Sequence, residues 1–232
     1  PDRPWRPDLR AAIAWAAGIG YRGITLDGAA AGVRARDLDS SARRDLAAVL
    51  RRSGLGFAGI DLWIPAAHFA DAARSDRAVS AVCDAAGLAA DLYRHAGLGQ
   101  WPVVHIQIGD APADVITAMG KAADRVGARL ADFTWAAGRA APGEPWGIGL
   151  DPAAVFLTGG DPAKEASRLG RGVLAARLSD IGPVGRVPPG AGRLDRVAYE
   201  VGLMTAGYEG ALTLDLRGVA EQARVAAEVI GV

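Results

Sequence analysis

The sequence predicts an α/β fold in which parallel strands alternate with helices. Short β-branched or apolar runs end in a polar residue, and each is followed by a longer stretch with helical periodicity. The helical stretches begin at Ser or Asp and end at Gly, as the ends of real helices do. The chain has 232 residues, half of them apolar, and contains no linker, low-complexity run or short-period repeat. We therefore expect one domain over residues 1–232.

Seven segments have the composition of buried strands. They are residues 22–28, 57–64, 102–109, 128–134, 146–151, 173–180 and 210–217. The helical stretches that flank them are residues 9–20, 41–54, 76–97, 113–127, 161–170, 194–207 and 219–231. The first of these helices should end near Gly18, and the second should start on a Ser cap and stop at Gly54.

A closed barrel of this type needs eight strands, and the additional strand should precede the first helix. Residues 1–7 contain Pro1, Pro4 and Pro7, which is too much proline for a central strand. Either the first strand lies upstream of this chain, or the barrel lacks it.

Composition argues against several classes of partner. Basic and acidic residues both number 26, so charge indicates neither nucleic acid nor a lipid surface. No apolar run approaches the length of a membrane span, and none has the pattern of a signal peptide. The single cysteine, Cys83, lies in an apolar helical pattern and fits a reducing, cytoplasmic setting. Nothing in the composition opposes a homo-oligomer.

Several phrases occur in an order that resembles the xylose-isomerase-like barrel family, which includes sugar phosphate isomerases and epimerases. The resemblance covers nearly the whole chain and implies a (β/α)8 TIM barrel. The phrases are GYRGITL (20–26), GLDPAAVFLTGGDP (149–162), RLSDIGPVGRVPPGAGRLD (177–195) and GYEGALTLDLRG (207–218).

The resemblance also implies one divalent metal ion (Mn, Mg, Co or Zn) at the carboxyl-end mouth of the barrel. In the family, a Glu, an Asp, a His and a second Glu from strands five to eight hold it. The metal polarises the oxygens of the sugar, while the carboxylates move a proton on and off the adjacent carbon.

This chain matches that ligand set only in part. Asp151 stands at the strand-six Asp position, and Asp215 stands where the last Glu is expected, one methylene shorter. The strand-five Glu position falls on Phe133, and the neighbouring Asp132 should point to the other face unless a bulge re-aims it. The strand-seven His position is Arg177, which cannot bind a metal. If a metal is bound, Asp151 and Asp215 are the expected ligands.

A metal-free alternative follows from the same residues. The Arg177 guanidinium, placed between Asp151 and Asp215, could supply the positive charge of the metal and bond to both carboxylates. These three residues are therefore the catalytic candidates, and the cofactor is either none or one divalent metal ion.

Other polar or aromatic residues at predicted strand ends are candidates for ligand binding. His105 and Gln107 alternate on one strand face, where they could contact a polyol or pair inside the barrel. Trp63 could form a floor for a sugar ring, although packing at the rim is the simpler role. Asp132, Asp180 and Arg217 also lie at or near strand ends.

Two functions remain open. The chain is either a sugar phosphate isomerase or epimerase-like protein with a degraded metal site, or a catalytically inactive relative. The inactive relative would bind a small polar, sugar-like ligand or act as a subunit of a complex.

Overall fold

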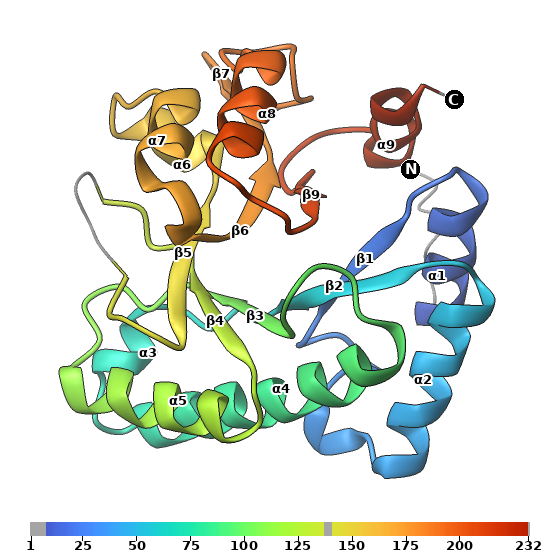
Figure 1. The fold of residues 1–232 in the computed structure, drawn as a ribbon, viewed down its shortest axis with the longest axis vertical. Coiled ribbons are helices and arrows are strands. Elements are labelled where there is room, and N and C mark those ends of the chain that lie inside the picture. Colours follow the sequence, from blue (N-terminus) through green and yellow to red (C-terminus); the bar gives the residue numbers. More distant parts are fainter. Residues whose placement is uncertain (1–7, 137–140, 232) are drawn as a thin grey trace.

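The computed structural model describes residues 8–136 and 141–231 and contains one large parallel sheet. Its seven strands follow the chain order around the sheet (Figure 1). They are β1 (Gly23–Asp27), β2 (Gly56–Asp61), β3 (Val103–Ile106), β4 (Arg129–Asp132), β5 (Trp146–Leu150), β6 (Val173–Leu178) and β9 (Leu212–Leu214). Each strand lies within or overlaps a segment predicted from the sequence. The fold is therefore the nearly closed parallel barrel that the alternation of elements indicates.

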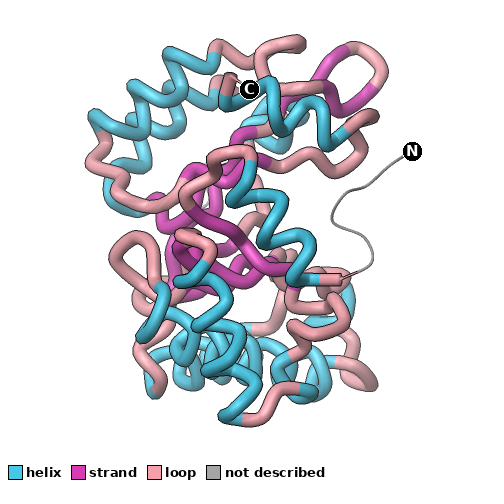
Figure 2. Tube along the Cα trace, turned by 90° about the vertical axis from the view of Figure 1, so that its right-hand side faces the viewer, coloured by secondary structure: helices cyan, strands magenta, loops and turns pink. Residues whose placement is uncertain are grey.

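Helices cover the outside of this sheet, as Figures 1 and 2 show. The helices α2, α4 and α5 pack beside one another, and α7 packs on α8. Their bounds are α1 (Leu9–Gly18), α2 (Ser40–Arg52), α3 (Ala67–Ala70), α4 (Ser75–Ala96), α5 (Ala113–Arg125), α6 (Pro152–Leu157), α7 (Pro162–Leu169), α8 (Arg196–Thr205) and α9 (Gln222–Ile230). No helix in the described part of the chain is long and apolar enough to cross a membrane.

Aspartate side chains cap the N-terminal ends of most of these helices. An Asp carboxylate accepts a backbone N–H of the first turn and so satisfies a donor that the helix itself leaves unpaired. The prediction of a Ser cap for the second helix is wrong, because Asp39 caps α2 and both serines lie inside it. The helices that have such a cap are α1, α2, α6, α7 and α8.

A small antiparallel hairpin follows β6 and was not expected from the sequence. It consists of β7 (Asp180–Gly182) and β8 (Gly185–Val187). The sequence Gly-Pro-Val-Gly at residues 182–185 turns the chain back, with Gly185 at φ 127°. Through this turn the hairpin adds Arg186 to the carboxyl end of the barrel.

The barrel does not close within the described residues. There, β1 pairs only with β2, and β9 pairs only with β6. Two edge strands therefore face each other at the place where an eighth strand is expected. The proline-rich residues 1–7 lie outside the described part of the chain.

Candidate functional site

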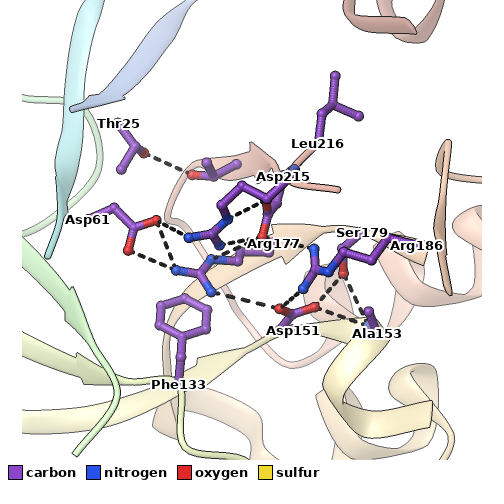
Figure 3. A network of polar contacts seen from close by, with 12 residues as sticks. Thr25, Asp61, Phe133, Asp151, Ala153, Arg177, Ser179, Arg186, Asp215 and Leu216 are labelled. Atoms are coloured by element: carbon purple, nitrogen blue, oxygen red, sulfur yellow. Dashed lines mark hydrogen bonds and ion pairs between the residues drawn. The ribbon is translucent and has the colours of Figure 1, made fainter. Parts of the chain in front are cut away.

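Carboxylates and guanidinium groups gather at the carboxyl ends of the strands (Figure 3). Asp61 ends β2, Asp151 follows β5, and Asp215 follows β9. Arg177 lies on β6 and Arg217 lies just after β9. Because all strands of the sheet are parallel, their carboxyl ends meet at one mouth, and this brings together residues that are far apart in the sequence.

Arg177 occupies the centre of this network. Its side chain is 3 % exposed, and its Nη2 donates to both carboxylate oxygens of Asp61, at 3.0 and 3.1 Å. The carboxylates of Asp151 and Asp215 lie at ion-pair distances of 3.7 and 3.9 Å from the same guanidinium. The sequence-based hypothesis therefore names the right neighbours of Arg177 but misses Asp61, the partner with which it makes hydrogen bonds.

The residue that bridges the two candidate metal ligands is Arg186. Its Nη2 lies 2.8 Å from Asp151 Oδ2, and its Nη1 lies 3.0 Å from Asp215 Oδ2. Sequence reasoning missed Arg186 because the hairpin that carries it was not predicted. A metal ion held by Asp151 and Asp215 would have to displace this guanidinium.

Asp151 is further fixed by its own helix. Its Oδ1 accepts the N–H of Ala153 at the start of α6 and the hydroxyl of Ser179. Both oxygens thus have hydrogen-bond donors within the protein, and the residue is 4 % exposed. The expected strand-six Asp is therefore present at the mouth, but its carboxylate is fully engaged.

Arg217 holds Asp215 and also covers Trp63. Its guanidinium donates to Asp215 and to Asp61, the latter at 3.1 Å, and its carbon lies 4.2 Å from the centre of the Trp63 ring. Burial alone would raise the pKa of Asp215. The hydrogen bond and charge of Arg217, together with the charges of Arg186 and Arg177, outweigh it and lower that pKa from 3.8 to about 2.

Asp61 has the opposite shift. Its burial raises the pKa above 3.8, although Arg177 and Arg217 act against this change. Two carboxylates of one mouth thus have pKa values moved in opposite directions, which is the arrangement in which one group can exchange a proton while the other stays ionised.

An open cavity of about 320 Å³ lies over this network. Trp63, which is 50 % exposed, forms part of its wall. Gln107 lies beside it in a smaller recess with Trp63 and Arg177, and its amide nitrogen lies 3.5 Å from the Phe133 carbonyl oxygen. Of the predicted site residues, the cavity brings together Trp63, Arg177, Asp215 and Arg217.

The other candidates lie away from that cavity. His105 is buried, with its ring centre 5.2 Å from that of Phe133. Burial and the charges of Arg177 and Arg217 lower the pKa of His105 to about 3, so the ring is neutral. Its Nδ1 has no hydrogen-bond partner among the described residues. The structure thus places His105 inside the barrel, and among the described residues no hydrogen bond pairs it with Gln107.

Asp132 and Asp180 accept hydrogen bonds from backbone N–H groups of neighbouring segments. The Oδ1 of Asp132 accepts the N–H of Thr134 at 2.8 Å and lies 3.3 Å from that of Ile108. Asp180, predicted to bind a ligand, is 1 % exposed, and its two oxygens accept five backbone N–H groups. These donors are Ile181, Gly190, Gly192, Arg193 and Leu194.

The residues of the mouth do not fit a divalent metal ion. Among the residues that the structure describes, no group of three or more His, Cys, Asp or Glu side chains could hold a metal. Three guanidinium groups lie among the three carboxylates, where a second cation would be repelled. The charges of this cluster balance without an added ion.

Comparison with solved structures identifies the fold. A xylose isomerase domain protein from Planctomyces limnophilus superposes with a TM-score of 0.73 at 15 % identity, over 94 % of this chain and 88 % of that one. The 3-keto-D-glucoside 4-epimerase YcjR from E. coli gives 0.72 at 13 % identity, over 98 % and 95 % of the two chains. A D-psicose 3-epimerase solved in the presence of D-fructose gives 0.70 at 12 % identity, over 97 % and 91 %.

No family model and no curated protein matches the sequence. The structural neighbours are xylose isomerase-like barrels and sugar epimerases, and this chain has their fold. At these identities the similarity concerns the fold alone.

Proposed function

We propose that this chain is a sugar isomerase- or epimerase-type barrel that binds a small, neutral, sugar-like molecule at its mouth. In this proposal fixed ion pairs take the place of a divalent metal. The observation that carries it is the position of Arg186, which bonds at 2.8 and 3.0 Å to the two aspartates expected to be metal ligands. Metal-dependent catalysis is lost, and ligand recognition is retained.

The chemistry of the mouth favours a neutral polyol over a phosphorylated sugar. Each sugar hydroxyl can donate to a carboxylate and accept from a guanidinium, and the mouth offers both kinds of group side by side. A phosphate bound to the arginines would also lie close to Asp61 and Asp215, and the negative charges of these carboxylates would repel it. Trp63 offers an apolar ring for the C–H face of a sugar. The D-psicose and 3-keto-D-glucoside epimerases among the neighbours are likewise named for sugars without phosphate.

Two measurements test this proposal. Protein purified without chelator is analysed for Mn, Mg, Co and Zn by elemental mass spectrometry, and Asp151→Ala is analysed beside it. We expect no stoichiometric metal in either protein. One metal per chain that disappears in Asp151→Ala would contradict the ion-pair mouth and restore metal-dependent isomerase chemistry.

Binding is then measured by calorimetry with ketohexoses such as D-psicose and D-fructose, each compared with its phosphate ester. We expect the neutral sugars to bind and the phosphates to bind more weakly. The exposed Arg224→Ala variant is the control and should bind these sugars as the unchanged protein does. Among the described contacts Arg224 pairs only with Glu228 on α9 and with Glu221, which directly precedes that helix. Tighter binding of the phosphates would count against a neutral ligand.

A second candidate function is epimerisation without metal, and the opposed pKa shifts of Asp61 and Asp215 favour it. Asp61 would take the proton from the carbon beside a sugar carbonyl, and Arg177 and Arg217 would stabilise the enolate oxygen that forms. A water molecule on the opposite face of that carbon would then supply a proton, which completes the inversion, and Asp61 would release its proton to solvent. Exchange of a sugar C–H hydrogen with deuterated water, seen by NMR and absent in Asp61→Asn, would support this activity. A sugar that binds without any exchange would leave binding as the function.

A further inference from the structure

A second cavity opens at the end of the barrel opposite the mouth. It has a volume of about 140 Å³ and lies where the strands begin, because Val103 and Val173, the first residues of β3 and β6, line it. Residues 98–101, before β3, and residues 207–211, before β9, form its rim. We call this cavity the amino-end recess. It shares no lining residue with the cavity of the mouth and is therefore a separate candidate site.

Tyrosine hydroxyls fix both rim segments. The Tyr93 hydroxyl donates to the Gly99 carbonyl oxygen at 2.8 Å, and the Tyr208 hydroxyl donates to the Ala211 carbonyl oxygen at 2.8 Å. Burial raises the pKa of Tyr208 to about 12, so its hydroxyl keeps the proton that it donates. The rim of the recess is thus preformed, and a ligand does not have to order it.

Two side chains of opposite charge stand at this rim. Arg171 is exposed, and within the described part of the chain it has no hydrogen bond or ion pair. A side chain at position 207 would lie 3.8 Å from its Nε, so Gly207 leaves room for the guanidinium. Glu209 follows two residues later, and the Gln100 amide donates to its carboxylate. A guanidinium and a carboxylate therefore border the same opening.

The walls below the rim are mostly apolar. Trp101, which is 44 % exposed, contributes its ring, and the Arg129 guanidinium carbon lies 4.5 Å from the centre of that ring. This contact supports the ring from one side. The deeper walls include Val103, Val173 and Ala175. Such walls suit a short apolar chain and give the hydroxyls of a sugar few hydrogen-bond partners.

His105 limits the depth of the recess. It lies two residues beyond Val103 on β3, is 2 % exposed and lines the inner end of the cavity. Its ring is neutral, so the inner end adds no charge to the recess. The volume is below the range of about 300–1,000 Å³ that is typical of pockets for drug-sized ligands, so the occupant is a small molecule.

These features restrict the chemistry of the occupant. A simple anion attracted by Arg171 would be repelled by Glu209, and a simple cation would meet the reverse. A hydrocarbon would gain nothing from the two charges. A molecule that carries both charges close together, with a short apolar chain beside them, matches the rim and the walls at once.

We infer that the amino-end recess binds a free α-amino acid with a short apolar side chain. The carboxylate of the ligand pairs with Arg171, and its ammonium group pairs with Glu209. The side chain of the ligand lies against the apolar walls beside Trp101. This inference does not depend on the ligand of the mouth.

The test compares ligands of one shape on the unchanged protein. L-valine carries both charges, 3-methylbutanoate lacks the ammonium group, and isobutylamine lacks the carboxylate. Binding is measured by calorimetry and by saturation-transfer NMR at neutral pH. We expect L-valine to bind and each analogue to bind at least about tenfold more weakly, because each loses one charge-assisted pair. Equal binding of all three ligands would overturn the inference, as would absence of binding by L-valine, L-alanine and L-leucine at millimolar concentration.

Two substitutions assign the charges. Arg171→Gln should weaken the binding of L-valine and of 3-methylbutanoate by about tenfold and leave that of isobutylamine unchanged. Glu209→Gln should weaken the binding of L-valine and of isobutylamine and leave that of 3-methylbutanoate unchanged. Misfolding cannot produce this crossed pattern, because each variant keeps the binding of one analogue.

Arg168→Gln is the matched control. Arg168 is also exposed, lies three residues before Arg171 and pairs with Glu165 on α7. This variant should bind all three ligands as the unchanged protein does. A loss of L-valine binding as large as that in Arg171→Gln would assign the effect to overall charge and would overturn the inference.

Discussion

The guanidinium carbon of Arg177 lies 3.7 Å from the centre of the Phe133 ring. By the resemblance of the sequence, these two residues stand at the strand-seven His and strand-five Glu positions of a metal site. Here they contact each other as a cation and an aromatic ring, an arrangement that stabilises a buried charge. Phe133 thus supports the guanidinium that the carboxylates of Asp61, Asp151 and Asp215 neutralise.

Removal of Arg177 should be the most destabilising change at the mouth. Arg177→Ala leaves Asp61 without one of its two arginines and weakens the neutralisation of Asp151 and Asp215. We expect a loss of about 3–5 kcal/mol in the free energy of unfolding, measured in urea, because the variant leaves buried carboxylates without their counter-charge. Arg224→Ala, which breaks only exposed pairs, should change it by less than about 1 kcal/mol. Similar values for the two variants would contradict the central role of Arg177.

Arg186 should contribute less than Arg177. Its side chain is 27 % exposed, so water can partly replace it at Asp151 and Asp215. We expect Arg186→Ala to cost about 1–2 kcal/mol in the same urea experiment. Arg186→Lys should recover only part of this, since one ammonium group cannot reproduce the two-pronged contact. Full recovery by Lys would show that charge alone matters and not the bridge.

His105 should lower the free energy of unfolding in mild acid. Its pKa in the folded chain is about 3, against 6.5 for an ordinary histidine. The unfolded chain therefore binds a proton between these two values while the folded chain does not. The stability that neutral His105 provides is complete above pH 6.5 and falls with decreasing pH by up to about 1.4 kcal/mol per unit, until pH 3. In His105→Gln, urea unfolding from pH 7 to 4 should lose this slope; an unchanged slope would assign it to other groups.

Trp63 should report the ligand of the mouth. Its ring forms part of the cavity wall and has Arg217 4.2 Å above its centre. A bound sugar should change the fluorescence of this half-exposed ring, and Trp63→Phe should remove most of that change. Trp63→Ala should weaken sugar binding by about tenfold through loss of the ring surface. Trp101 is 44 % exposed and lines the amino-end recess at the other end of the barrel. The matched control is therefore Trp101→Phe, which should leave the fluorescence change on sugar binding intact.

The sequence by itself determined the order and direction of the main elements. Alternating apolar runs and helical stretches predicted all seven strands of the parallel sheet, because burial imposes different periods on strands and helices. It also placed Asp151, Arg177 and Asp215 at strand ends, and parallel strands bring such ends together. The short hairpin of β7 and β8 was missed, although the Gly-Pro-Val-Gly turn was a usable signal.

Only the tertiary structure decided which charges meet. The sequence around Asp61 and Arg186 does not mark either residue as part of a site. A long arginine side chain can also reach many different partners. The packing of the hairpin against the mouth selected Asp151 and Asp215 for Arg186, and barrel curvature brought Asp61 to Arg177 across 116 positions of the chain. Ion pairs depend on distances of a few ångströms between segments remote in sequence, and a periodic pattern of residues does not encode such distances.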